Sequence, residues 1–229
     1  MFDFHQKAHT YIRDFVFGRD FPCIAGQSAV KTHHYALCAY SNMESDQVAE
    51  GVCHDLVRYM GKFSFDRPFN TFIAAFEKPD IETQLGGVES FYLLLRNMHT
   101  VDRKHFAFTA DQGVSPDTMS PDFVYSVGGE GFFVPFFYAF SGSAARRSDI
   151  NFVVFNANKA FEFLRRTGAF DKLKERIRAN LPDVHPNLGD HGQAPQFPQY
   201  ALVFQDSASQ AGEQEIRKEI LGECPFHPK

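Results

Sequence analysis

The stretch FVYSVGGEGFFVPFFYAF, residues 123–140, gives the clearest indication of the fold. Two runs rich in Phe and Val, 123–127 and 132–140, flank the turn Gly128-Gly129-Glu130-Gly131. Glycine supplies the positive φ angles that tight hairpin turns need, and aromatic and β-branched residues favour strands. The stretch therefore predicts a β-hairpin. Because a strand follows the glycines, and not a helix, they are not expected to hold a phosphate group.

Apolar patterning outside this hairpin predicts further strands and helices. The strands are expected at 30–40, 69–77, 151–156 and, in a short form, 200–204. The helices are expected at 3–17, from Asn42 or Ser45 to about Met60, and at 81–101, 157–166, 170–181 and 213–221. Residues 20–27 are expected to be a loop that leads into the first strand. This order predicts one α+β domain over residues 1–229, with a mixed or mostly antiparallel sheet and flanking helices.

The apolar composition is unusual in kind. The chain has 27 Phe and no Trp, while its 44% hydrophobic and 22% charged residues are ordinary for a globular protein. Phe buries a large apolar surface and has no polar atom that needs a partner. Two uses are open for these rings: filling the core, and lining a dry cavity for an aromatic cofactor.

Charge and hydropathy exclude several partners and compartments. A net charge of −5 and a pI near 6.0 give no basic field for nucleic acid or an anionic membrane. No apolar run approaches the roughly twenty residues that span a bilayer, and the N-terminus lacks the pattern of a secretory signal. A cytoplasmic location is therefore expected, with the four cysteines as free thiols and not disulfides.

Three elements could carry chemistry. Cys23, in Phe21-Pro22-Cys23, could ligate iron or act as a nucleophile, or it could be a small buried apolar residue. Arg146 and Arg147 lie between two apolar strands, where a guanidinium fork suits a carboxylate, but the two residues by themselves favour a solvated turn. His185 stands before a proline in a late loop. No zinc spacing, HExxH, P-loop, GxGxxG or GxSxG occurs, but a single axial ligand to haem needs no such motif.

Taken in order along nearly the whole chain, these pieces resemble the YqcI/YcgG family. The matching residues are Phe21-Pro22-Cys23-Ile24 with Gly26, Phe132-Phe133-Val134, Arg146-Arg147-Ser148, Phe155-Asn156, Phe161-Glu162, Leu164-Arg165, His185-Pro186-Asn187-Leu188-Gly189, Gly192, Gln199-Tyr200 and Cys224-Pro225-Phe226. The resemblance implies a haem-dependent monooxygenase that hydroxylates a nitrogen of a guanidine- or amine-containing small molecule in biosynthesis. It implies haem b as the cofactor, held without covalent attachment, and an external electron donor. A non-catalytic haem-binding or sensing protein of the same fold is the alternative, and a structural domain without cofactor is a third possibility.

The resemblance also leads to an expectation about the iron ligand. Many members carry a histidine near 137–141, and this chain has none there, so the ligand must come from elsewhere. The candidates, in order of preference, are the imidazole of His185, the thiolate of Cys23 and the phenolate of Tyr138. Arg146 or Arg147 is expected to contact an acidic group of the cofactor or substrate. For the carboxylate that would pair with a cationic substrate, Glu130, Asp149, Asp183 and Asp190 all remain open.

Overall fold

The computed structural model describes residues 2–19, 21–62, 69–106, 115, 118, 120–179 and 197–221. The helices in this part of the chain are α1 (Phe2–Val16), α2 (Ile24–Lys31), α3 (Asp46–Met60), α4 (Gln84–His105), α5 (Asn158–Arg166), α6 (Ala169–Ala179) and α7 (Ser207–Leu221). The strands are β1 (Tyr35–Asn42), β2 (Thr71–Lys78), β3 (Tyr125–Val127), β4 (Glu130–Phe133), β5 (Phe136–Phe137) and β6 (Asn151–Ala157).

These strands form one mixed sheet with the order β1-β2-β6-β4-β3, and β5 also pairs with β6. Only β1 and β2 run parallel, with Leu37 opposite Ile73, and the other pairs are antiparallel. The α+β class and the mixed sheet predicted from the sequence are therefore confirmed.

The hairpin forms as predicted but its second strand is shorter than expected. Gly128 and Gly129 have φ angles of 59° and 80°, as a two-residue hairpin turn between β3 and β4 requires. The strand ends at Phe133, and Pro135 follows, which has no N–H to donate to a neighbouring strand. Its carbonyl instead accepts a hydrogen bond from the Val154 N–H, and the chain returns to the sheet for the two residues of β5.

Two expectations from the sequence were wrong. Residues 24–31 form helix α2, not a loop and the start of a strand, because Cys23 caps the helix: its Sγ accepts a hydrogen bond from the Gly26 N–H. Residues 200–204 form no strand and follow a 3-10 turn at Phe197–Gln199. Their backbone makes isolated hydrogen bonds, from the Phe136 N–H to the Tyr200 carbonyl and from the Gly142 N–H to the Leu202 carbonyl.

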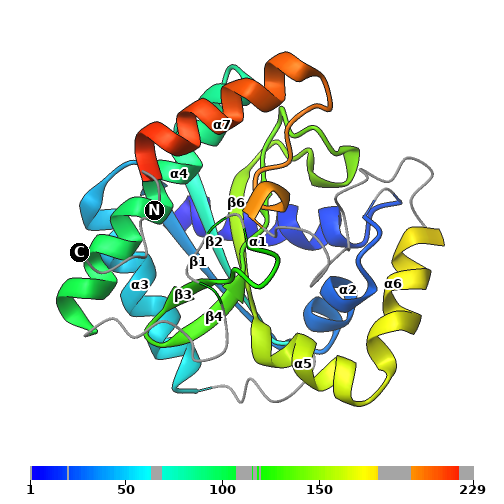
Figure 1. Cartoon of the computed structure of the whole chain (residues 1–229). Coiled ribbons are helices and arrows are strands. Elements are labelled where there is room, and N and C mark those ends of the chain that lie inside the picture. Colours follow the sequence, from blue (N-terminus) through cyan, green and yellow to red (C-terminus); the bar gives the residue numbers. More distant parts are fainter. Residues whose placement is uncertain are drawn as a thin grey trace.

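The sheet separates two hydrophobic cores, because successive side chains of a strand point to opposite faces. Phe72, Ala74 and Phe76 of β2 belong to a larger core that also includes α3, α4 and α7. Ile73 and Ala75 belong to a smaller core that also includes side chains of α1, at the beginning of the chain. Figure 1 shows α3, α4 and α7 gathered at one side of the sheet, whereas α2, α5 and α6 lie together at the other. No helix within the described residues is long and apolar enough to cross a membrane.

Candidate functional site: an apolar cavity with a cysteine and a buried arginine

A cavity of about 220 Å³ lies on the face of the sheet that carries the smaller core. Its walls come from α1, α2, the sheet, α5 and α6, which are far apart in sequence. Seven phenylalanines line it: Phe21, Phe69, Phe133, Phe137, Phe152, Phe161 and Phe170. Part of the large Phe content therefore forms a cavity wall, and the rest fills the cores.

The polar side chains in this wall are few. Among the described lining residues, only Cys23, Arg146 and Lys174 are ionisable, and none is an aspartate or glutamate. At the start of β2, the Thr71 hydroxyl donates to Oδ1 of Asn156 across the sheet at 3.1 Å. The described wall is therefore positively charged and largely apolar, with Asn70, Thr71 and Asn156 as its uncharged polar residues.

Cys23 occupies the N-terminal end of α2. Its backbone is extended, with φ −80° and ψ 98°. Its Sγ lies 3.4 Å from the Gly26 nitrogen and accepts a hydrogen bond from that N–H. Burial raises the pKa of the thiol, and the N–H groups of Gly26 and Ala25 together with Arg146 act in the opposite direction. Helix N-termini and nearby cations favour the thiolate, which is the form that binds metals. The position suits a thiol that loses its proton when a metal binds.

Arg146 is almost fully buried, with 5% of its surface exposed. It ends the 3-10 turn Ala144–Arg146, and its Nη1 donates to the backbone carbonyls of Gln199 and Tyr200, the latter at 3.1 Å. Its guanidinium carbon lies 5.9 Å from the ring centres of both Phe133 and Phe137. Burial lowers its pKa to about 9, so the group still carries its charge at neutral pH. The sequence left a solvated turn open here, but only the neighbouring Arg147 is solvated.

Arg147 and Tyr138 lie away from the cavity. Arg147 is exposed, its Nε donates to the Ser141 carbonyl at 2.9 Å, and its guanidinium covers the Phe204 ring. Tyr138 belongs to the larger core, where its ring stacks on Phe136 with centroids 4.6 Å apart. Of the four cofactor-binding residues expected from the sequence, the structure brings together Cys23 and Arg146.

The remaining candidates fall in two groups. His185, Asp183 and Asp190 lie outside the described residues, so the expectations about them stay predictions. Of the other acidic candidates, Glu130 pairs with Lys159, and Asp149 is exposed and does not line the cavity.

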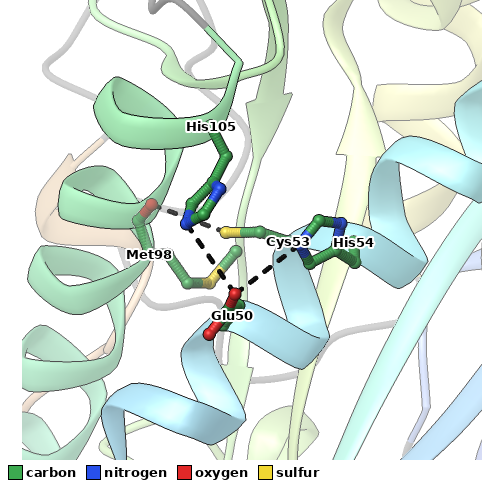
Figure 2. Close-up of polar contacts among 5 residues, drawn as sticks. All are labelled: Glu50, Cys53, His54, Met98 and His105. Atoms are coloured by element: carbon green, nitrogen blue, oxygen red, sulfur yellow. Dashed lines mark hydrogen bonds and ion pairs between the residues drawn. The ribbon is translucent and has the colours of Figure 1, made fainter.

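A second polar cluster joins α3 to α4, as Figure 2 shows. The Glu50 carboxylate lies 3.7 Å from Nε2 of His105 and 3.9 Å from Nε2 of His54. One helical turn along α3, the buried Cys53 thiol donates to the Met98 carbonyl at 3.5 Å. In the described part of the chain, neither this cluster nor any other group of three or more His, Cys, Asp or Glu side chains is placed to hold a metal ion.

Sequence reasoning missed the wall that α5 and α6 provide. Ala160, Phe161 and Leu164 face the cavity from α5, and Phe170, Leu173 and Ile177 face it from α6. Their helical spacing was visible in the sequence, but spacing alone does not separate a cavity wall from a filled core.

Comparison with models of known protein families places the chain in one family. Residues 12–227 match the YqcI/YcgG family, so the chain belongs to that family. The search of curated proteins found no match, and neither did the search of solved structures.

The family resemblance implies a haem. The side chains that line the cavity suit a haem chemically, but the cavity is too small to hold one. A thiol, phenylalanine walls and a buried cation are suitable contacts for a porphyrin with an iron centre and carboxylate side chains. The volume of 220 Å³ exceeds the roughly 150 Å³ of a cavity that takes benzene, but falls short of the roughly 300–1,000 Å³ of most ligand pockets. A macrocycle would therefore require the described walls to move apart.

Proposed function

We propose that this chain is a haem-dependent monooxygenase that hydroxylates a nitrogen of a guanidine- or amine-containing small molecule, with Cys23 as the iron ligand. The observation that carries the proposal is the position of Cys23. Within the described residues, it is the one thiol in the wall of the phenylalanine-lined cavity. The reaction class comes from the family resemblance, and the cavity supplies a compatible donor.

The chain's own residues support a thiolate ligand at this point. The Gly26 N–H donates to Sγ, and the N-terminal end of α2 favours negative charge there. Pro22 fixes the backbone on the other side of Cys23 and is itself buried. A haem held through this thiolate would supply oxygen activation, and the thiolate would favour O–O cleavage.

The walls would keep water from the reacting centre. Phe137 and Phe152 stack with centroids 4.4 Å apart, and Phe15 packs edge-on against both. Rigid aromatic packing of this kind gives a dry surface, which suppresses side reactions of activated oxygen. The electrons would come from an external donor, since the sequence contains no flavin or iron–sulfur motif.

The alternative function is haem binding or sensing without turnover. One observation favours it: the described wall contains no carboxylate to pair with a cationic guanidine or amine. Haem binding alone would need only Cys23, the aromatic walls and Arg146. Product formation separates the two functions, because a sensor would bind haem and release no hydroxylated product from a panel of amines and guanidines.

The test of haem binding is a spectrum with matched cysteine variants. The protein is produced with iron and a haem precursor, and the absorption of the ferric and ferrous–CO states is recorded for wild type, Cys23→Ser and Cys38→Ser. Cys38 is also partly buried but lies on β1 outside the cavity. We expect the red-shifted ferrous–CO band of thiolate ligation in wild type and in Cys38→Ser, and its loss in Cys23→Ser.

A variant of His185, the ligand preferred from the sequence, completes this test. If His185→Ala loses the haem spectrum while Cys23→Ser keeps it, the ligand is His185 and the assignment of Cys23 is wrong. If acid and acetone leave the pigment attached to the protein, the haem is covalently bound and the expectation of haem b fails. A wild-type protein that remains colourless would refute the proposed function.

A further inference from the structure

Among the described residues, the charge of Arg146 has no anionic partner near the cavity. No aspartate or glutamate of the described residues forms an ion pair with Arg146. Within the described residues, its guanidinium donates hydrogen bonds through Nη1 only, and both go to backbone carbonyls. Burying a cation in an apolar site is unfavourable unless an anion pairs with it. The contacts that Arg146 makes within the fold, with two carbonyls and two aromatic rings, leave its charge without an anion among the described residues.

The surroundings hold the guanidinium in one place. Nη1 is fixed by the carbonyls of Gln199 and Tyr200, and the rings of Phe133 and Phe137 lie at equal distances from the guanidinium carbon. The rest of the planar fork remains for a ligand in the cavity, and this fork matches a carboxylate in a bidentate geometry.

We propose that Arg146 binds a carboxylate inside the cavity, supplied either by an organic acid substrate or by a propionate of the haem. The propionate source rests on the proposed function, and the substrate source does not. A substrate recognised in this way is a carboxylic acid with an apolar body, because the walls around Arg146 are phenylalanine and aliphatic side chains.

The first experiment uses the protein without haem and two probes of equal shape. Phenylacetate carries the carboxylate, and phenylacetamide replaces it with a neutral amide. Binding of each is measured by ligand-observed NMR titration at neutral pH. Because a charged hydrogen bond is stronger than a neutral one, we expect phenylacetate to bind at least about tenfold more tightly. Equal binding of both probes, or binding of neither, excludes the substrate source.

Variants then assign the preference to one residue. Arg146→Gln should reduce the ratio of the two affinities to about one, and Arg146→Lys should leave a smaller preference because it keeps the charge but loses the fork. Arg147→Gln is the matched control, since this adjacent arginine is exposed and lies outside the cavity wall. If Arg146→Gln does not fold, the Arg146→Lys variant decides. An unchanged ratio in Arg146→Lys, or an equal loss in Arg147→Gln, would overturn the assignment.

The second experiment tests the haem propionate as the source. Haemin and haemin dimethyl ester, whose propionates are esterified, are titrated into wild type and Arg146→Lys. A propionate contact predicts that wild type prefers haemin by about tenfold or more and that the variant loses most of this preference. If both pigments bind wild type equally, the propionate source is excluded. If the phenylacetate preference is also absent, the proposal fails even where haem binding itself succeeds.

Discussion

Replacing Arg146 by methionine should leave the free energy of unfolding within about 2 kcal/mol of wild type, although the residue is almost fully buried. The lowering of its pKa to about 9 by burial corresponds to about 5 kcal/mol that disfavours the charged form in the folded protein. Against this, the two hydrogen bonds from Nη1 to the Gln199 and Tyr200 carbonyls contribute about 1.5–3 kcal/mol each. The two effects nearly cancel, and methionine fills a similar volume.

The assay is urea unfolding followed by far-ultraviolet circular dichroism, with two reference variants. Arg147→Met changes an exposed residue and should stay within about 0.5 kcal/mol of wild type. Phe137→Ala removes a buried ring that stacks on Phe152 and should lower the free energy of unfolding by about 3–5 kcal/mol. If Arg146→Met falls by a similar amount, Arg146 is needed for the fold and the reasoning that assigns it to a ligand is refuted.

The lowered pKa of Arg146 also predicts how the free energy of unfolding depends on pH. The folded protein releases the Arg146 proton at lower pH than the unfolded chain does, so this residue's penalty is fully present below about pH 9 and declines at higher pH. The free energy of unfolding of wild type relative to Arg146→Met should therefore rise as the pH increases above about 9. A constant difference between the two proteins across that range would contradict the burial of an unpaired charge.

Three further predictions concern other parts of the fold. Gly87→Ala should destabilise the protein by about 1–3 kcal/mol, because an added Cβ would lie 2.6 Å from the Tyr138 ring. Gly51→Ala in α3 should stabilise it by about 0.5–1 kcal/mol, because there the added Cβ meets Tyr40 at an ordinary 3.5 Å. Thermal unfolding of both variants tests this contrast. An alkylating reagent, with peptide mass spectrometry as the readout, should modify Cys53 only after unfolding, because this thiol is buried and burial raises its pKa. Cys38 should react faster as the pH approaches its pKa of about 11. Rapid labelling of Cys53 in the folded protein would contradict its placement. Glu50→Gln should change the free energy of unfolding in urea by less than about 1 kcal/mol, because the side chains of Glu50, His54 and His105 are partly exposed to solvent. A larger loss would show that these contacts contribute to holding α3 against α4.

Local signals in the sequence were sufficient for much of the fold. Ser45 caps α3, and the end of this helix at Met60, before Gly61, was also predicted, because side-chain caps and glycine stops act within a few residues. The turn at Gly128 and Gly129 was predictable for the same reason. The helix that begins after Cys23 was missed because cysteine is not among the usual capping residues and Gly26 favoured a loop.

The candidate site was only partly predictable, because it depends on contacts between distant segments. Cys23 and Arg146 were recognised by residue type and by the family resemblance. No local pattern distinguished Arg146 from Arg147, since their difference in burial arises where residues 197–200 pack against the turn. The volume and the positive charge of the cavity likewise emerge only when α1, α2, α5 and α6 meet on one face of the sheet.

The alternation of β2 and β6 between two cores has a consequence for how this protein could diversify. Side chains of the larger core, such as Phe72 and Phe155, point away from the cavity, whereas Ile73 and Val154, the next residues along the two strands, line it. Substitutions at the cavity positions can therefore reshape ligand recognition while the packing on the opposite side of the same strands is kept. The family could acquire new specificities by exchanging residues on one face of the sheet, with the other face conserving the stability of the fold.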